Sequence, residues 1–410
     1  MREEWTEARI DELGNGLRPV LKAGPFGSSV TKAIYQASGY KVYGQQEVVA
    51  KDFNAEAYFV SEATFRRHKG CVVKPGDLLM TMMGTIGRVY RVPEGAPEGI
   101  INPRLVRIAF DTSRILPEYA EAALEQPPLQ RLLDRRSHGG TMQGLNLNAL
   151  ASIRLPLPPL PEQCKIAAVL QTWDTAIQKA EQLIAAKERY KKALMQRVFE
   201  TGSYPPCRLS EFTRRVTRKN VEGDGHPLTI SGAEGLVSQS RYFGKRIAAE
   251  KTEHYTLLKR GEYAYNKSYS AGYPLGAIKR LDAHDEGIVS TLYLCFALDE
   301  GKAPISDYFA YFCEAGGFNH QIYQVAQEGA RNHGLLNVTA DDFFSMTMPI
   351  PPSDVQERVV KVLGTAMREL ALLREQLTAL RSQKRGLMQK LLTGRWRLPI
   401  TLHTEEAING

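Results

Sequence analysis

One long stretch of this chain occurs twice, about 193 residues apart, and this internal duplication constrains the fold more than any other feature of the sequence. Residues 155–199 align on residues 348–392 without a gap. The identical pairs include Pro156 and Pro349, Pro158 and Pro351, Pro159 and Pro352, Gln163 and Gln356, Val169 and Val362, Leu170 and Leu363, Lys191 and Lys384, Leu194 and Leu387, Met195 and Met388, and Gln196 and Gln389. A repeat of this length predicts a pseudo-dimer folded from a single polypeptide.

Both copies carry a stripe of mostly apolar residues, spaced alternately by four and three positions as in the a and d positions of a coiled coil. The first stripe comprises Ile166, Leu170, Trp173, Ile177, Ala180, Ile184, Lys187, Lys191, Leu194 and Val198, and the second comprises Val359, Leu363, Ala366, Leu370, Leu373, Leu377, Leu380, Lys384, Leu387 and Leu391. Proline-rich segments precede both stripes, and the Thr-Gly pairs at 201–202 and 393–394 can end both helices, because glycine readily forms an αL cap. About 40 residues at ~1.5 Å each predict a helical rod of roughly 60 Å.

A single stripe of this kind would suit an ordinary core helix equally well. Two stripes in matched register favour a coiled coil, and the long segments between them favour antiparallel pairing. A blunt-ended pairing would place Trp173 opposite Lys384 and Lys191 opposite Ala366. A lysine in such a seam costs stability but fixes the register, and the ammonium of Lys384 would be able to lie over the Trp173 ring.

The duplication continues into the segments between the predicted helices. Residues 74–80, 84–87 and 99–108 have counterparts at 259–265, 275–278 and 287–294. Short β-rich runs between glycine and proline turns, followed by an amphipathic helix at 115–133 or 305–325, predict a mixed sheet domain in each half. The segment 208–212 also parallels 9–13, and 397–398 resembles the start of a third copy. This cyclic order predicts that the two ends of the chain meet in space.

Composition limits the class of protein. With 410 residues and 43% hydrophobic content the chain can bury two cores, and no run approaches the ~20 apolar residues of a membrane span. Five cysteines without a C-x-x-C pair, and an N-terminus without an apolar signal segment, predict structural thiols in a reducing cytoplasm. The net charge of +8 suits a polyanionic partner, although many soluble proteins are basic.

The sequence carries none of the motifs that we associate with covalent chemistry. It has no G-x-x-x-x-G-K-[ST] phosphate loop, no G-x-S-x-G nucleophile elbow and no glycine-rich methyl-donor loop. The nearest approach to an Asn-Pro-Pro-Tyr tetrapeptide is Asn102-Pro103-Arg104. We therefore predict that the chain itself is not an enzyme.

With these motifs in view, the chain resembles the specificity subunit of a type I restriction-modification system along essentially its whole length. The most specific matches are the two Pro-x-Pro-Pro helix repeats, Lys-Pro-Gly-Asp-Leu-Leu-Met at 74–80 with Gly-Thr-Ile-Gly at 84–87, and residues 272–281. The resemblance implies a mixed α/β fold in which an antiparallel two-helix coiled coil separates two pseudo-symmetric target-recognition domains. The first seam departs from the second by carrying Trp173 and two lysines, which leaves open whether the two ends of the rod are equivalent.

The resemblance also implies a phage-defence role and a set of partners. Each domain would read one half of a split site in double-stranded DNA, and two methyltransferase subunits and restriction/translocase subunits would assemble on the chain. S-adenosylmethionine, ATP and Mg would belong to those subunits, so that this chain binds no cofactor and no metal. The expected domains are target-recognition domain 1 at 1–154, spacer helix 1 at 155–202, target-recognition domain 2 at 203–347, spacer helix 2 at 348–395 and a C-terminal tail at 396–410.

Candidate DNA contacts are polar and basic clusters, because base edges require donors and acceptors while phosphates attract lysine and arginine. In the first domain they are Phe26, Gly27, Ser28, Ser29, Lys32, Gln36, Tyr43, Gln45, Lys51, Arg66 and Arg67. In the second they are Asn266, Lys267, Ser268, Tyr269, Arg331, Asn332 and His333, with Arg214, Arg215, Arg218 and Lys219 as phosphate contacts. Each cluster is equally compatible with a solvated loop, and residues 24–29 with a simple turn.

Candidate coiled-coil and partner residues are Ile166, Leu170, Trp173, Ile177, Ile184, Met195, Leu363, Leu370, Leu377, Lys384 and Met388. The duplicated residues off the seam, Val169, Met195 and Phe199 with Val362, Met388 and Leu392, can pack on a neighbouring domain or bind a partner, and we favour domain packing. Two other functions compete with the specificity subunit. One is a stand-alone pseudo-dimeric DNA-binding regulator, and the other is a coiled-coil scaffold for proteins.

Overall fold

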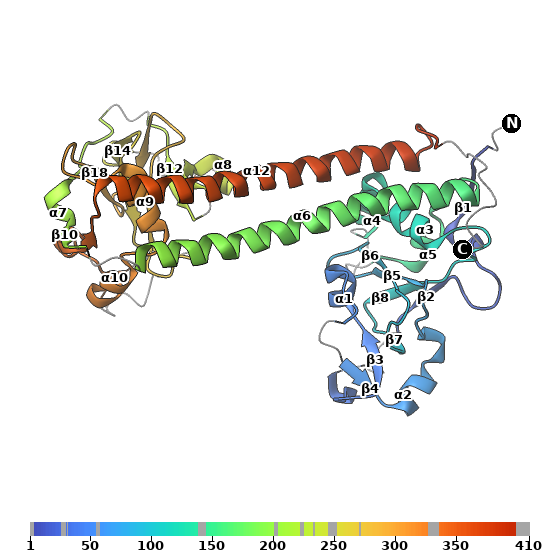
Figure 1. The fold of residues 1–410 in the computed structure, drawn as a ribbon. Coiled ribbons are helices and arrows are strands. Elements are labelled where there is room, and N and C mark those ends of the chain that lie inside the picture. The colour runs from blue at the N-terminus through green and yellow to red at the C-terminus, as the bar shows by residue number, and fades with distance from the viewer. Residues whose placement is uncertain are drawn as a thin grey trace, which may run out of the picture. The chain divides into compact units, whose positions relative to one another are not determined.

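The computed structural model describes residues 4–25, 30, 32–54, 58–137, 145–200, 204–221, 225–232, 234–244, 252–269, 272–326 and 336–398. The chain divides into two compact units (Figure 1). Unit 1 contains residues 1–181 and 376–410, and unit 2 contains residues 182–375. Two long helices, α6 (Leu160–Glu200) and α12 (Ser353–Leu392), each contribute one part to each unit. Among the described segments, none of the helices has the length and apolar content that a membrane span requires.

The globular part of unit 1 is built on a four-stranded antiparallel sheet of order β2-β8-β5-β6. A second sheet of order β4-β3-β7 pairs β3 with β7 in parallel, and β1 pairs with β9. The strands are β1 (Thr6–Arg9), β2 (Leu21–Ala23), β3 (Tyr40–Tyr43), β4 (Tyr58–Val60), β5 (Leu78–Thr81), β6 (Val89–Arg91), β7 (Gly99–Ile101), β8 (Leu105–Ile108) and β9 (Arg154–Leu157). The helices are η1 (Ile10–Glu12), η3 (Lys32–Ile34), α1 (Gln45–Ala50), α2 (Glu62–Arg67), η4 (Lys69–Cys71), α3 (Pro117–Glu125), α4 (Pro127–Ser137) and α5 (Leu147–Ala151).

The globular part of unit 2 repeats the four-stranded sheet in the order β11-β18-β15-β16. Three two-stranded sheets, β10-β19, β12-β13 and β14-β17, surround it. The strands are β10 (Pro206–Arg208), β11 (Thr213–Arg215), β12 (Leu228–Ser231), β13 (Gly235–Ser238), β14 (Thr256–Lys259), β15 (Tyr263–Asn266), β16 (Ala277–Arg280), β17 (Glu286–Val289), β18 (Leu294–Leu298) and β19 (Thr347–Pro349). The helices are α7 (Leu209–Phe212), α8 (Gln239–Phe243), α9 (Ser306–Glu314), α10 (Asn319–Val325) and α11 (Ala340–Ser345). Both globules are therefore mixed α/β domains, as predicted.

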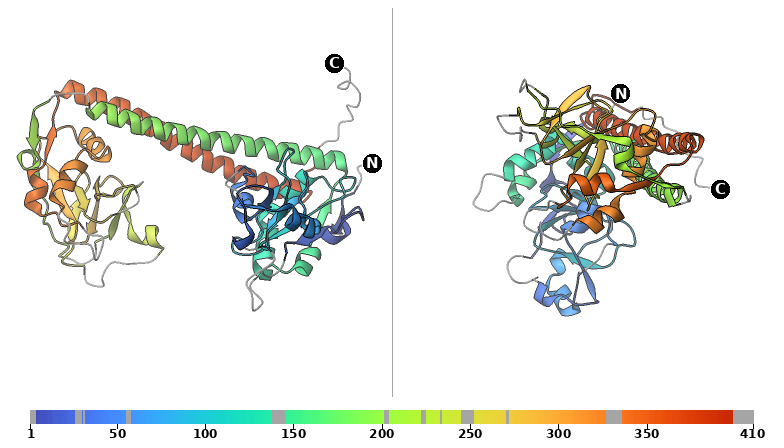
Figure 2. Two further views of the ribbon diagram at one scale, coloured as in Figure 1. Left: turned by 90° about the horizontal axis from the view of Figure 1, so that it is seen from below. Right: turned by 90° about the vertical axis from the view of Figure 1, so that its left-hand side faces the viewer.

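The predicted seams are confirmed residue by residue. Every predicted a and d position of α6 and α12 is buried or half-buried. Ile166 is fully buried, and even the lysines at 187, 191 and 384 are half-buried. The seam buries apolar side chains while most neighbouring positions stay exposed, which is the pattern of a two-helix coil. In each unit the two helix segments lie side by side (Figure 2).

Ion pairs across the seam show the direction and register of the helices. In unit 1 Arg381 donates to Glu181 over 2.6 Å and Lys384 pairs with Asp174, and in unit 2 Lys187 lies 2.7 Å from Glu369. The residue numbers rise along one helix as they fall along the other, so the pairing is antiparallel. The predicted register is confirmed, since Lys384 meets the residue that follows Trp173. The expected partner is corrected, because the ammonium binds the Asp174 carboxylate.

The cores of the two units differ in composition. Core 1 is mainly aliphatic and includes Leu78 and Ile108 of the sheet with Ile166 of α6 and Leu391 and Leu392 of α12. Core 2 is rich in aromatic residues. Its buried members include Phe212, Tyr263, Tyr265, Phe296, Phe309, Phe312, Phe318 and Phe343.

Most of the duplicated residues off the seam pack against these cores, which confirms domain packing for them. Met388 and Leu392 are buried in core 1, Val169 packs against it, and Phe199 packs against core 2. Met195 is also buried, at 4% exposure, whereas Val362 has 47% of its surface exposed. Its environment differs from that of Val169 although both come from the same repeat.

The predicted meeting of the chain's two terminal segments is confirmed within unit 1. Glu162, in the first turn of α6, has a side chain that is only 1% exposed. Its carboxylate accepts hydrogen bonds from Arg397 at 2.7 Å and from the indole of Trp5 at 3.0 Å. The guanidinium of Arg397 also lies 5.3 Å from the centre of the Trp5 ring. Residues near both ends are thereby fixed on the start of one spacer helix.

Candidate nucleic-acid interface

Three segments of the first domain converge on one loop surface. Gln45, at the start of α1, donates from its amide to the carbonyl of Met83, and Arg104 donates to the Gln45 carbonyl oxygen over 3.4 Å. The Met82 amide also donates to the Arg104 carbonyl over 2.9 Å. These contacts tie together the turn after β5, the turn before β8 and the end of β3.

Local backbone chemistry explains why these turns form. The Asn102 side chain accepts a hydrogen bond from the Arg104 amide at 2.9 Å, which closes a tight turn. Gly84 and Gly87 have φ values of 67° and 76°, which glycine adopts without steric cost. A Cβ atom at Gly24 would lie 1.9 Å from the Asn102 carbonyl oxygen, so only glycine permits this close approach. The loop predicted at 24–29 thus starts beside the Asn102 turn.

The same surface carries aromatic rings. Tyr35 and Tyr58 stack with their centroids 4.7 Å apart, and Tyr58 is 45% exposed. Burial raises the pKa of Tyr35, helped by the nearby Tyr58 and Glu47, while the charge of Arg104 opposes the rise. A guanidinium, amide groups and exposed rings are the side chains that hydrogen-bond to bases, neutralise phosphates and stack on nucleic acid.

The second domain joins corresponding segments in the same way. The amide of Leu336 donates to the carbonyl of Lys267 over 3.0 Å, just as Leu145 donates to Met82 over 2.9 Å. The Asn266 side chain accepts from the Ser268 amide at 3.0 Å. In both domains the same backbone contact therefore joins the turn after the central strand to the segment that closes the domain.

Exposed apolar and aromatic residues flank this anchor in the second domain. Tyr269 is 67% exposed, and Leu292, in the turn before β18, is 55% exposed. That turn corresponds to the Asn102 turn of the first domain. The ammonium of Lys267 donates to the Val338 carbonyl over 3.2 Å, so it holds the loop in place.

Comparisons with known proteins identify relatives of this chain. Residues 2–188 match the family model described as the type I restriction modification DNA specificity domain. A putative type I restriction enzyme specificity subunit, MjaX, of Methanocaldococcus jannaschii is 22% identical over 350 residues, which are 79% of each chain. The EcoBI specificity subunit of Escherichia coli is 25% identical over 165 residues, which are 40% of this chain and 31% of that protein.

Over residues 2–188 the chain carries a type I restriction-modification DNA specificity domain, and its relatives are named as specificity subunits of such systems. The crystal structure of the system's S subunit from M. genitalium has the same fold, with a TM-score of 0.54, 14% identity and 97% coverage of both chains. A solved structure described as the structural basis underlying complex assembly and conformational transition of the type I R-M system has a TM-score of 0.56 and 16% identity. The match covers 95% of this chain and 97% of that chain. The family resemblance predicted from the repeats is confirmed. Specificity subunits are non-catalytic components, so the chain is the non-enzymatic member of its system.

Several predicted contacts of this specificity subunit lie at the loop surfaces. Gln45 and residues 266–269 belong to the anchored turns described above. Gln36 is exposed, and its backbone N–H donates to the Phe59 carbonyl over 2.9 Å. Lys32 lies in η3, although its side chain is not described. Phe26, Gly27, Ser28 and Ser29 in the first domain, and Arg331, Asn332 and His333 in the second, lie outside the described residues.

Two predicted contacts are corrected because their side chains are committed to the fold. Tyr43 is fully buried, and its hydroxyl donates to the Pro97 carbonyl. Arg218 makes an ion pair of 3.0 Å with Glu262 and also donates to the Leu257 carbonyl over 3.0 Å. Arg18 pairs with Asp77 in the corresponding place of the first domain, so this contact is a structural element of both domains.

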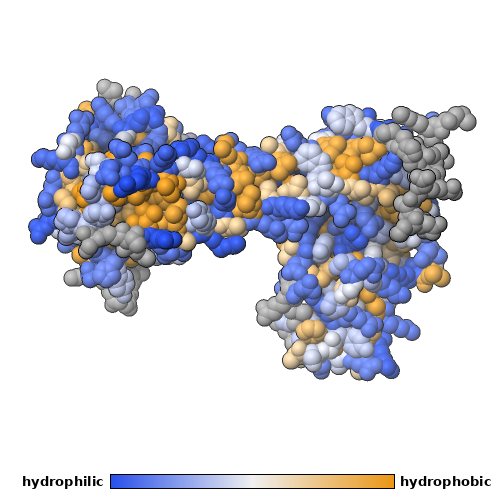
Figure 3. All heavy atoms as spheres, viewed as in Figure 1, coloured by the Kyte–Doolittle hydropathy of each residue, from blue (hydrophilic) through white to orange (hydrophobic). Residues whose placement is uncertain are grey.

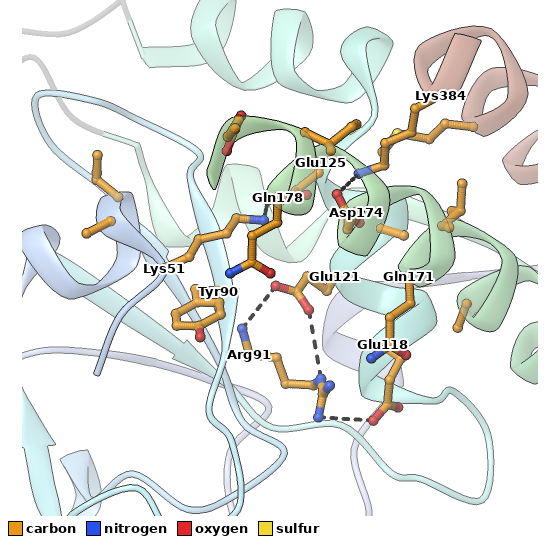
Figure 4. A pocket seen from close by; sticks show the side chains of 18 residues that line it. Lys51, Tyr90, Arg91, Glu118, Glu121, Glu125, Gln171, Asp174, Gln178 and Lys384 are labelled. Atoms are coloured by element: carbon orange, nitrogen blue, oxygen red, sulfur yellow. Dashed lines mark hydrogen bonds and ion pairs between the residues drawn. The ribbon is translucent and has the colours of Figure 1, made fainter. Parts of the chain in front are cut away.

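Lys51 lies apart from the recognition loops, in a cleft of about 560 Å³ beside α3 and α6 (Figure 4). Its ammonium is 2.7 Å from Glu125. Burial lowers the pKa of Lys51, but the charge and hydrogen bond of Glu125, together with the charges of Glu121 and Asp174, raise it overall. Across the same cleft, Arg91 lies 3.1 Å from Glu118, and burial together with Glu125 raises the pKa of Glu121.

The remaining basic candidates are solvent-exposed. Arg66 pairs with Glu62 one turn earlier in α2, and Arg67 ends that helix. Arg214 and Arg215 extend from β11, with Arg214 3.7 Å from Asp299, and Lys219 donates to the His254 carbonyl over 3.0 Å. Sequence reasoning missed Arg104, although the Asn-Pro-Arg turn that presents it was visible.

Proposed function

We propose that this chain is the DNA specificity subunit of a type I restriction-modification complex that reads a bipartite target, with one domain per half-site. The observation that carries this proposal is the repeated loop anchor, Leu145 to Met82 in one domain and Leu336 to Lys267 in the other. Two copies of one presentation geometry, with different side chains around them, suit two readers of different base sequences. Donors, acceptors and guanidinium groups at these loops supply direct readout, and exposed arginines supply phosphate contacts.

The spacer helices can supply the stiff connection that a reader of a split site also needs. A split site with an unread gap needs its two readers joined by a stiff element, and paired helices are stiffer than a flexible linker. Gln163 of α6 and Gln356 of α12 attach one domain each. Their side-chain oxygens accept from the amides of Leu116 at 2.8 Å and Ile305 at 2.7 Å.

The duplicated helices would also provide two equivalent surfaces for partner subunits. We assign two methyltransferase subunits and restriction/translocase subunits to this assembly, in keeping with the family. S-adenosylmethionine, ATP and Mg belong to those subunits in this proposal. Calorimetry of the isolated chain with S-adenosylmethionine should detect no binding, and tight binding would refute this division of labour.

The function is tested by producing the chain with its methyltransferase partner and mapping methylated adenines across the host genome. The expected result is a single motif made of two specific halves and an unspecified gap. A motif without a gap, or a stable complex that methylates no motif, would contradict the proposal. DNA binding by the chain without any stable association with the methyltransferase would instead support a stand-alone regulator.

A further inference from the structure

The two lysines that occupy the same place in the helix repeats bind different elements. Lys384 of α12 pairs with Asp174 of α6, so its contact stays within the helix pair. Lys191 of α6 lies 3.7 Å from Glu314, the last residue of α9 in the second domain. Both lysine side chains are mostly buried, at 16% and 24% exposure.

Glu314 is itself held firmly by the second domain. The Tyr273 hydroxyl lies 2.9 Å from both oxygens of the Glu314 carboxylate, and Lys279 of β16 pairs with the same carboxylate. Lys279 also donates to the Gly232 carbonyl over 3.0 Å and lies 4.6 Å from the centre of the Tyr273 ring. This network joins α9, the central sheet and the β12–β13 turn at the Glu314 carboxylate. Lys191 of α6 contacts the same carboxylate.

The corresponding carboxylate of the first domain has a different partner. Glu125 is the last residue of α3, as Glu314 is of α9. It pairs with Lys51, which belongs to the same domain, and the cleft lies between this pair and the helix pair (Figure 4). Among the residues described here, no ion pair links α3 to either spacer helix.

Within the part of the chain that the structure describes, polar contacts with the helices therefore hold α9 at both ends but hold α3 only at its first end, through Gln163. The amide before α9, at Ile305, is bound by Gln356 of α12, and the other end of α9 is contacted by Lys191 of α6. The amide before α3 is bound by Gln163, whereas its far end has no charged contact with the helices. A nine-residue helix is ~13 Å long, so a contact at each end restrains its direction where a contact at one end allows it to pivot.

We infer that Lys191 and Glu314 are positioning residues that fix the angle of the second recognition domain on the helix pair and so restrict the gap length of the DNA target. This inference rests on the proposed function, since it assumes a split target read by two domains. The two residues need not touch DNA. They act through the direction in which the recognition loops of the second domain are held.

The test uses the full complex with the methyltransferase and a set of DNA duplexes in which both half-sites are fixed and the gap is varied by one base pair in each direction. Lys191→Met and Glu314→Gln should raise methylation of the altered gaps, relative to the cognate gap, by about threefold to tenfold, the range of a partly buried ion pair. Both half-sites should remain specific. Lys191→Arg should keep the wild-type gap preference, because arginine keeps the positive charge.

The control is Lys384→Met, which removes the equivalent lysine without touching a domain contact and should leave the gap preference as in the wild type. An apolar residue in a coiled-coil seam stabilises the coil, so Lys191→Met should not lower the melting temperature. A purely structural role predicts the opposite pattern, a lower melting temperature with an unchanged gap preference, and would overturn the inference. If the wild-type complex itself recognises no split motif, the proposed function fails, whereas a strict gap in both variants refutes only the positioning role.

Discussion

The two units use the same backbone plan but attach their domains to the helix pair with different chemistry. In unit 1 the start of α6 carries the buried Glu162, which binds Trp5 and Arg397. The corresponding position in α12 is Val355, and unit 2 places aromatic contacts at the far end of α6 instead. There Phe199 lies 5.5 Å from Tyr308 and 5.4 Å from Phe312, measured between ring centroids.

The comparison separates what the duplication preserves from what it allows to vary. The strand order of the four-stranded sheet, the loop anchor and the glutamine contacts to Leu116 and Ile305 are the same in both halves. The surface of unit 2 shows hydrophobic patches along its part of the helix pair, between hydrophilic side chains (Figure 3). Geometry that positions the recognition loops is thus retained, while the interactions that stabilise each unit have diverged.

The strongest test of the shared geometry is to exchange one domain. Replacing residues 203–347 with the equivalent block of another family member should change one half of the methylated motif completely. The other half and the approximate gap should stay the same, because the helices and the first domain are untouched. Genome-wide methylation mapping gives the answer, and a hybrid with both halves altered would show that the domains read DNA jointly.

The next largest effect should come from the charged contact of unit 1. Glu162→Gln should lower the free energy of unfolding by roughly 2–4 kcal/mol at neutral pH, because it removes one partner of a buried ion pair. Asp354→Asn, in the first turn of α12, is the matched control, and its exposed pair with Arg358 should contribute at most about 1 kcal/mol. Denaturant unfolding measures both variants.

This effect should depend on pH with a definite sign. Burial would raise the pKa of Glu162, but the hydrogen bonds from Arg397, Trp5 and the Leu398 backbone and the charge of Arg397 together lower it. A lowered folded-state pKa contributes stability above the unfolded value of about 4.3 and loses it as the pH falls through the folded value. The difference between wild type and Glu162→Gln should therefore shrink at acidic pH, and a difference that grows there would contradict the assignment.

A smaller and equal effect is expected from the two domain-attaching glutamines. Gln163→Leu and Gln356→Leu should each cost about 1–3 kcal/mol, because each leaves a half-buried backbone amide without its acceptor. The two losses should agree within roughly 0.5 kcal/mol in denaturant unfolding. A large inequality would show that the preserved contacts are not energetically equivalent.

The smallest effect should appear at a repeat position whose two valines differ in burial. Val362→Ser should change the free energy of unfolding by less than about 0.5 kcal/mol, because the side chain is 47% exposed. Val169→Ser should cost about 1 kcal/mol, because Val169 packs against core 1. Equal losses in thermal or denaturant unfolding would show that Val362 is covered in solution.

Helical periodicity and duplication made much of the fold predictable. The seam from Ile166 to Val198, the antiparallel register at Lys384 and the meeting of the two terminal segments all follow from the repeats. The partners of individual polar side chains could not be predicted in this way, because spacing along the sequence does not show which distant residues come into contact in the fold. Lys51 and Arg218 seemed available for DNA, yet Glu125 and Glu262 bind them.

Tyr43 shows the same limit for aromatic residues, since a tyrosine near a predicted loop can equally close a core. The recognition surface itself was predictable only in outline. Glycine and asparagine turns marked where the loops begin, but the convergence of Gln45, Met83 and Arg104 depends on sheet pairing between distant segments. Sequence patterns locate such turns without showing which of them share a surface.

The contribution of α12 to core 1 has a consequence for synthesis on the ribosome. Ile166 and Leu170 pack with Leu391 and Leu392, which are translated roughly 200 residues later, an interval of about 10–40 s at typical rates of synthesis. Unit 2, spanning residues 182–375, can close before those residues emerge. The domain translated first is therefore completed last, and its unfinished apolar surface is open to chaperones during that interval.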